Sequence, residues 1–322
     1  MTASNLEVTF RPYRPGDEIG INDGFNSVFN MGRSLEEWRW KFPEQPEGRY
    51  IMLAVAPTGR VLAHYGAVAM QVQFGNERVR AGEIVDAYSR EDVRGTRVFS
   101  TCYEHFINLY GNPEGLPLMF GFPGRRHYEM GLKALKYVPI SSVPFWSRQA
   151  RRRLSLASWC YKVRQGFDAH AVEDLWRRAG TRYDVAAVRD AEWLARRYCE
   201  RPGVNYLHLS AWRHGRAQAW AVVRAQEGTL RWADLIWDGE DVGSLAALDR
   251  TLDRLASLHS CGRLELWLRG DPPAERALEG YGWSRQPCPH DLLMVARSFK
   301  LVVDLERMQR SCYVTMGDSD LV

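Results

Sequence analysis

The chain of 322 residues carries one pattern of residues twice, and this internal repeat limits the folds open to it more than any other feature. Tyr50 in the first half has a counterpart in Tyr206, 156 positions later. Asp86 has a counterpart in Asp234, 148 positions later. The strand-like and helix-like segments around these residues follow in the same order. Self-similarity at a nearly fixed offset indicates two copies of one supersecondary unit.

The order of segments within each copy predicts the fold class. Alternating strands joined by Gly-containing turns fill the middle, such as Val61–Phe74 after the turn at 57–60. Strands and helices then alternate toward the end of each copy. This combination is typical of a mixed sheet rather than a fully parallel one. We expect an α/β (α+β) chain of two tandem domains, each a mixed, mostly antiparallel twisted sheet flanked by helices.

A basic stretch separates the two copies. Residues 146–165 hold six Arg or Lys side chains and no acid, which we interpret as an inter-domain linker, with a contact to a polyanion as the alternative. The expected organisation is an N-terminal domain at 1–145, this linker, a C-terminal domain at 166–299 and a tail at 300–322.

The composition narrows the class of protein. Hydrophobic residues make up 45% and charged residues 25%, as in soluble globular proteins, and the net charge of +4 permits an anionic ligand without arguing for nucleic acid. The six cysteines lack metal-ligand spacing, so we expect reduced thiols, a cytoplasmic protein and no metal site. The N-terminus lacks the apolar core of a secretion signal, and no window approaches the roughly 20 apolar residues of a membrane span.

A strand, a basic turn and a helix form the most informative stretch of the first copy. The strand is Glu83–Tyr88, the turn is Arg94-Gly95-Thr96-Arg97, and the helix that follows has an apolar stripe beginning at Phe99. A Gly-containing turn that opens a helix presents backbone N–H groups and the positive end of the helix dipole. We expect a phosphate-bearing cofactor to bind here.

This order of elements resembles the GNAT N-acetyltransferases. Their hallmark turn, Arg/Gln-x-x-Gly-x-Gly/Ala, holds the pyrophosphate of acetyl-CoA, and the VRGTRVFS segment resembles a variant of it. Arg94 matches the first position, Arg97 stands where the second Gly belongs, and Phe99 replaces the last small residue. The resemblance covers both halves and implies a tandem GNAT protein that uses acetyl-CoA or another acyl-CoA. It places the cofactor at Tyr88, Ser89, Arg94, Gly95, Thr96, Arg97, Val98 and Phe99.

Transfer in this family is a direct attack of an amine on a thioester, and it needs a base for the amine and an acid for the leaving thiolate. Glu83 and Asp86 on the strand are the base candidates. Since strand side chains alternate, we expect the two on opposite faces and prefer Asp86. The recurrence of Asp234 favours a structural carboxylate instead. The family's acid is often a Tyr on the last helix, which points to Tyr128, and His127 is a further candidate base.

The second copy supplies a control for the turn. It carries Asp238-Gly239-Glu240-Asp241 where the first copy carries Arg94–Arg97. One unit charge about 5 Å from a phosphate, at an effective dielectric of about 20, changes the interaction energy by about 3 kcal/mol. We therefore expect the second copy to be a degenerate partner that does not bind coenzyme A.

These inferences predict an N-acyltransferase that moves an acetyl or acyl group from acyl-CoA to a primary amine of a small molecule or sugar intermediate. The closing segment resembles GNAT-like proteins of bacterial biosynthesis. One alternative is a GNAT-like aminoacyltransferase that uses aminoacyl-tRNA, with the basic run at 148–164 meeting RNA phosphates. The other is a non-catalytic GNAT-like binding protein.

Overall fold

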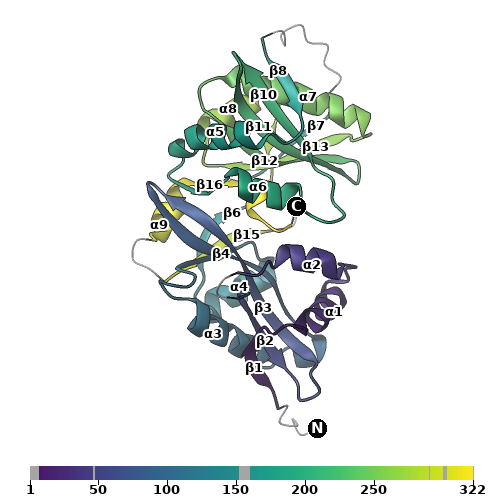
Figure 1. The fold of residues 1–322 in the computed structure, drawn as a ribbon, viewed down its shortest axis with the longest axis vertical. Helices are drawn as coiled ribbons and strands as arrows, with labels where there is room; N and C mark the ends of the chain where they lie inside the picture. Colours follow the sequence, from purple (N-terminus) through teal and green to yellow (C-terminus); the bar gives the residue numbers. More distant parts are fainter. Residues whose placement is uncertain (1–6, 46–47, 152–159, 290, 300–302, 322) are drawn as a thin grey trace. The chain divides into compact units, whose positions relative to one another are not determined.

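A computed structural model describes residues 7–45, 48–151, 160–289, 291–299 and 303–321. These residues divide into two compact units (Figure 1). Unit 1 contains the described parts of 1–71, 79–140 and 293–305. Unit 2 contains those of 72–78, 141–292 and 306–322.

Unit 1 is one sheet with helices on both faces (Figure 1). Its elements are β1 (Thr9–Pro12), α1 (Asp17–Phe29), α2 (Leu35–Lys41), β2 (Ile51–Val55), β3 (Val61–Phe74), β4 (Glu77–Ser89), η1 (Glu91–Val93), α3 (Val98–Tyr110), β5 (Leu118–Gly121), α4 (Arg125–Ala134), β6 (Val138–Ser142) and β15 (Leu293–Ser298). The ends of β3 and β4 at 72–78 and the end of β6 at 141–142 are grouped with unit 2. The strand order is β1-β2-β3-β4-β5-β15-β6. Within it β4 and β5 are parallel, while β1–β2, β2–β3 and β5–β15 are antiparallel.

Successive side chains of β2 point to opposite faces of the sheet, so this strand contributes to two buried cores. Ile51 and Leu53 face α1 and α2, where they join Trp38 in a buried cluster. Met52 and Ala54 face α3 and pack in a second cluster. A mostly antiparallel sheet with both faces covered therefore forms as the period-two pattern predicts. Ser34 accepts a hydrogen bond from the Glu37 amide and caps α2.

Unit 2 repeats this construction. Its elements are β7 (Phe145–Gln149), β8 (Lys162–Gln165), α5 (Ala169–Ala179), η2 (Gly180–Arg182), β9 (Val185–Ala187), α6 (Ala191–Tyr198), β10 (Leu207–Arg213), β11 (Arg216–Gln226), β12 (Thr229–Trp237), α7 (Val242–Leu258), β13 (Arg263–Arg269), α8 (Pro272–Gly280), β14 (Ser284–Arg285), α9 (Leu305–Ser311, its first residue grouped with unit 1), β16 (Cys312–Thr315) and η3 (Met316–Asp318). The main strand order is β8-β10-β11-β12-β13-β7-β14, and β16 pairs with both β13 and β9.

The expectation of a linker at 146–165 is wrong for the residues at its two ends. Strand β7 pairs with β13, and strand β8 pairs with β10, so both belong to the sheet of unit 2. Arg148 on β7 is buried and forms ion pairs with Asp249 (2.8 Å) and Asp253 (2.5 Å). Residues 152–159 of the expected linker lie outside the described residues.

Each sheet contains a strand that the expected boundaries assign elsewhere. Strand β15, which follows the second copy in sequence, pairs with β5 of unit 1. Strand β7, which follows the first copy, pairs with β13 of unit 2. The expected domain boundaries at 145 and 300 therefore do not coincide with the strands that each sheet contains. None of the helices formed by the described residues has the length and apolarity that a membrane crossing requires.

Candidate functional site

Strands β4 and β5 separate partway along their length. Their parallel register runs through Ala81↔Leu118 and Gly82↔Met119 and ends at Glu83↔Phe120. Beyond Glu83, strand β4 continues for six residues to Ser89. Among the described residues, no other strand is registered against this part of β4 on the β5 side. The backbone there is open to a ligand that hydrogen-bonds along a strand edge.

Asp86 interrupts the alternation of β4. It has φ of 52°, a left-handed conformation that Asp tolerates better than most residues. Val85 and Tyr88 pack on the α1/α2 face, while Ile84 and Ala87 pack on the α3 face. The spacing of three across Asp86 in both pairs is that of a β-bulge.

The expectation that Glu83 and Asp86 lie on opposite faces of the strand is therefore wrong. The carboxylate of Asp86 contacts Arg33 and Lys41, so it points to the face of α1 and α2. Glu83 lies two residues before Val85, which packs on that face. Side chains alternate between the two faces up to the bulge, so Glu83 lies on the same α1/α2 face as Val85 and Asp86.

The turn before α3 has the features of an anion site. Residues Arg94 to Arg97 are all exposed, and Gly95 has φ of 81°, which glycine adopts without strain. A Cβ atom at Gly95 would meet nothing within 4 Å, so the backbone is open to close approach. The first turn of α3 contains no acidic residue. A pyrophosphate fits this turn in both charge and space.

Both arginines of the turn are available to a ligand. Among the described residues, neither guanidinium has an ion pair or a hydrogen bond, whereas Arg60 nearby pairs with Asp92 at 2.6 Å. Arg97 has φ of −80° and ψ of −2°, an ordinary conformation for a residue with a side chain. The arginine at the second glycine position of the motif is therefore accommodated without backbone strain.

Asp86 is an ion-paired carboxylate rather than a free base. Its side chain is 1% exposed and lies 2.5 Å from Lys41 Nζ, with Arg33 on its other oxygen. Burial alone raises the pKa of Asp86, but the charges of Lys41 and Arg33 hold it below its ordinary value. A carboxylate held in this way binds a proton weakly, so Asp86 is better suited to a structural ion pair than to accepting a proton.

His64 completes the surroundings of Asp86. Its Nδ1 lies 2.8 Å from the backbone oxygen of Asp86, and its ring stacks on Tyr88 at 5.5 Å between centroids. Burial lowers the pKa of His64 to about 4, so the ring is neutral near pH 7. A carbonyl accepts, so Nδ1 of this neutral ring is the protonated nitrogen. His64 thus fixes the backbone of the bulge.

Tyr88 and Ser89 lie at the end of β4. The Tyr88 hydroxyl donates to the backbone oxygen of Ile21 at 2.9 Å, and the ring is buried against α1. Its side chain serves packing, so only its backbone is open to a ligand. Ser89 is half-buried beside the turn.

The candidates on α4 lie on the α3 face instead. The His127 ring makes an edge contact with Phe99, and Nε2 lies 3.4 Å from the Tyr137 hydroxyl. Burial lowers the pKa of His127 to about 4. Tyr128 is half-buried, and its hydroxyl has no partner among the described residues. Val98 and Phe99 are half-buried in the first turn of α3 and pack on the α3-face core. The structure therefore brings His127 next to the first turn of α3, which follows Arg94–Arg97, and leaves Glu83 on the other face of the sheet.

Unit 2 reproduces the buried ion pair. Arg189 donates to Asp234 at 2.9 Å, and both side chains are 0% exposed. Arg189 and Arg33 are 156 positions apart, the offset that separates Tyr50 from Tyr206. Sequence reasoning missed both arginines, although this offset could have identified them.

The chain's own C-terminal segment fills the corresponding opening of unit 2. The register of β12 with β13 ends at Trp232↔Leu266, and β16 and η3 contact both strands beyond that point. The Tyr313 hydroxyl donates to Leu235 O at 2.7 Å, and Thr315 donates to Asp234 at 2.8 Å. Between β4 and β5 of unit 1, the described residues place no such segment.

The acidic turn of unit 2 is internally paired. Asp238 lies 3.1 Å from Arg178, and Asp241 lies 2.6 Å from Arg213. A Cβ atom at Gly239 would lie 2.1 Å from the Nε of Arg182, so that guanidinium occupies the approach to the turn. Charge and space both oppose a phosphate there. No cluster of three or more His, Cys, Asp or Glu side chains suited to a metal is found among the described residues.

Comparison with known proteins identifies the fold. No family model and no curated protein sequence matches the chain. A GCN5-related N-acetyltransferase from Anabaena variabilis ATCC 29413 superposes with a TM-score of 0.70 at 10% identity, over 92% of this chain and 74% of that one. A probable N-acyltransferase from Enterococcus faecalis V583 superposes with a TM-score of 0.67 at 14% identity, over 92% and 73%.

A third solved structure is an acyltransferase with its donor. N-myristoyltransferase from Saccharomyces cerevisiae with bound myristoyl-CoA superposes with a TM-score of 0.61 at 10% identity, over 92% of this chain and 83% of that one. The chain therefore has the fold of the GCN5-related N-acetyltransferases, a mixed and mostly antiparallel sheet flanked by helices, as its sequence predicts.

Proposed function

We propose that the chain is an acyl-CoA-dependent N-acyltransferase whose donor site lies in unit 1. One observation carries the proposal: β4 leaves β5 after Glu83 and leads through η1 to a turn at the start of α3, whose two arginines have no ion pair among the described residues. The open strand edge suits the amide groups of a pantetheine arm, and the turn suits a pyrophosphate. Acetyl-CoA is the donor we propose.

The reaction is a displacement at the thioester carbonyl. The amine nitrogen attacks the carbonyl carbon, a C–N bond forms and the C–S bond breaks. The nitrogen loses one proton, and the departing thiolate gains one. The chain has to supply a proton acceptor, a proton donor and backbone N–H groups near the carbonyl oxygen.

Glu83 is the proton acceptor we propose. It is 2% exposed and sits at the last registered position of β4, where the two strands part. The sequence favours Asp86 as the base, but in the structure Arg33 and Lys41 hold its carboxylate. We assign Asp86 the role of a positioning residue for the bulge and for α2.

Tyr128 is the proton donor we propose for the thiolate. It follows His127, whose ring touches Phe99 in the first turn of α3. Its hydroxyl has no partner among the described residues, so its proton can be given to a ligand without breaking a bond within the protein. His127, whose pKa burial lowers to about 4, positions the start of α4.

The acceptor we propose is a primary amine of a small molecule or sugar intermediate. The tRNA-dependent alternative has less support, because Arg148 of the basic run is buried on Asp249 and Asp253. Arg164 of the same run stacks on Trp212 at 3.9 Å.

Release of free thiol from acetyl-CoA in the presence of a panel of primary amines tests this function. We expect amine-dependent thiol release by the full chain and its loss in Glu83→Gln. Binding of acetyl-CoA without thiol release from any amine would favour the non-catalytic alternative. Salt-sensitive binding of tRNA without binding of acetyl-CoA would favour the aminoacyl-tRNA alternative.

A further inference from the structure

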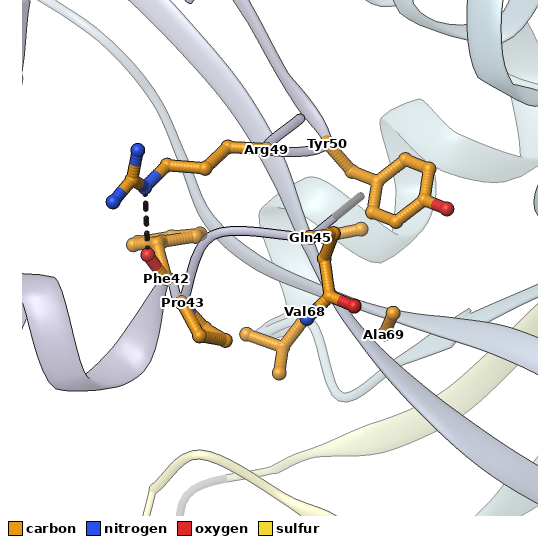
Figure 2. A pocket seen from close by; sticks show the side chains of 8 residues that line it. Phe42, Pro43, Gln45, Arg49, Tyr50, Val68 and Ala69 are labelled. Atoms are coloured by element: carbon orange, nitrogen blue, oxygen red, sulfur yellow. Dashed lines mark hydrogen bonds between the residues drawn. The ribbon is translucent and has the colours of Figure 1, made fainter. Parts of the chain in front are cut away.

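A shallow hollow with a cavity volume of about 10 Å³ lies beside β3 in unit 1, where β3 extends past the beginning of β2 (Figure 2). It is lined by Phe42, Pro43, Gln45, Arg49, Tyr50, Ala67, Val68 and Ala69. Among the residues that the structure describes, no acidic side chain belongs to this lining. The hollow itself has room for about one water-sized group, so a larger group can bind only at its rim.

Arg49 is held rigidly at the rim of the hollow. Its Nε donates to the backbone oxygen of Phe42 at 2.8 Å, as the dashed line in Figure 2 shows. Its guanidinium also lies over the rings of Tyr13 (5.0 Å) and Trp38 (5.5 Å). Neither Nη atom has an acceptor among the described residues. A guanidinium fixed through Nε and aromatic faces, with its outer N–H groups free, is arranged for a carboxylate or phosphate.

The internal repeat indicates that the scaffold does not require Arg49. The repeat offset of 156 aligns Arg49 with Asn205, although Tyr50 and Tyr206 correspond. Unit 2 therefore retains the fold with a neutral residue at this position. A role in ligand binding accounts for an arginine in unit 1 alone.

The hollow lies one strand away from the proposed base. Gly75 and Asn76 form the two-residue turn between Phe74 of β3 and Glu77 of β4. An antiparallel register that starts from this turn places Val68 opposite Glu83. Val68 lines the hollow. An acceptor whose amine reaches Glu83 can therefore place another group at the hollow.

We propose that the acceptor amine carries an anionic group, a carboxylate or a phosphate, and that Arg49 binds this group at the rim of the hollow. This inference rests on the proposed function and narrows its acceptor to anionic amines. Arg49 contributes to acceptor recognition and takes no part in proton transfer.

The test compares charged amines with neutral partners of the same shape. The panel pairs amino acids with their amides, and phosphoethanolamine with ethanolamine. Thermal shift measures binding to the full chain, and thiol release from acetyl-CoA measures kcat and KM. We expect at least one anionic amine to bind about tenfold more tightly than its neutral partner. The carboxylate and phosphate pairs show which anion is preferred.

Arg49→Gln is the decisive variant, and Arg39→Gln is its control. Arg39 is also on the α2 side, but its side chain is 59% exposed and is absent from the lining of the hollow. We expect Arg49→Gln to remove the preference by raising KM for the anionic amine about tenfold, with kcat and the values for the neutral amine unchanged. Arg39→Gln should keep the preference.

The inference is wrong if the natural chain binds no anionic amine better than its neutral partner. It is also wrong if Arg49→Gln lowers binding of both partners equally. Binding of acetyl-CoA is measured separately by thermal shift. If acetyl-CoA binds and the anionic preference is missing, the proposed function stands and the inference fails. If the preference is present and acetyl-CoA does not bind, the proposed function fails.

Discussion

Arg33 in unit 1 and Asp86 on β4 form an ion pair that is buried almost completely, with side chains that are 4% and 1% exposed. Lys41 shares the carboxylate. Removal of one partner of a buried pair leaves the other charge uncompensated, which typically lowers stability by 3–5 kcal/mol. We expect Asp86→Asn to lower the free energy of unfolding by about this amount in urea titrations.

The control for this substitution is Asp92→Asn. Asp92 pairs with Arg60 at 2.6 Å, but both side chains are about half exposed. Exposed pairs contribute roughly 0–1 kcal/mol, so this variant should unfold close to the natural chain. Equal effects of the two substitutions would contradict the structural role given to Asp86.

The stabilisation by Asp86 should depend on pH in one direction. Its pKa is lowered in the folded chain, so the carboxylate contributes stability above its unfolded pKa of about 4. The contribution is lost as the pH falls through the lower folded value. We expect the difference in unfolding free energy between the natural chain and Asp86→Asn to be constant from about pH 5 to 7 and to shrink below about pH 4. A difference that grows on acidification would contradict the sign of the shift.

Gly95 tests whether the backbone of the turn binds the donor. Alanine at φ of 81° is strained by about 1 kcal/mol and displaces the amides that precede α3. Gly16→Ala is a matched control, since Gly16 also has positive φ, 100°, and a Cβ there also meets nothing within 4 Å. We expect both variants to lose similar stability, while only Gly95→Ala weakens acetyl-CoA binding in thermal-shift titrations. Equal loss of binding in both would assign the effect to general destabilisation.

Glu83 should separate catalysis from donor binding. Loss of a general base lowers the rate about 10²–10⁴-fold, so we expect Glu83→Gln to lower kcat to this extent while the Kd of acetyl-CoA stays unchanged. Raising the pH should recover part of the activity, because more of the amine is then neutral without a base. An unchanged kcat would remove Glu83 from the mechanism.

The C-terminal segment should stabilise unit 2 without serving the donor site. Thr315 accepts from Arg189 at 2.9 Å and donates to Asp234 at 2.8 Å, in a fully buried network. Thr315→Val removes both hydrogen bonds, each of which contributes about 0.5–1.5 kcal/mol, so stability should fall by about 1–3 kcal/mol. We expect a lower midpoint of thermal unfolding and an unchanged Kd of acetyl-CoA. A large loss of acetyl-CoA binding would show that unit 2 takes part in donor binding.

The fold was predictable because the internal repeat and the period-two pattern of β2 and β3 can be recognised from the sequence alone. The bulge was not, because one residue with positive φ at Asp86 reverses the alternation without a compositional signal. The basic run around Arg148 predicts a linker, because the acidic partners of Arg148, Asp249 and Asp253, are 101 and 105 positions away. Ion pairs between residues this far apart in sequence can be recognised only when the pairing of β7 with β13 is known.

The candidate site also has features that the sequence predicts and features that it does not. The turn at Arg94–Arg97 could be found from sequence, since charge and glycine spacing are local. The choice between Glu83 and Asp86 depends on Arg33, which lies 53 positions before Asp86, so no local pattern links the two residues. The filled opening of unit 2 could not be inferred from the tail, because no sequence pattern places Tyr313 beside Leu235.

Isothermal titration of the full chain with acetyl-CoA tests the central claim most directly. We expect one binding site per chain, with affinity about tenfold lower in Arg94→Gln and in Arg97→Gln and unchanged in Arg177→Gln, an exposed arginine on α5. Two sites per chain, no binding, or binding that is insensitive to Arg94 and Arg97 would contradict a single donor site at the start of α3.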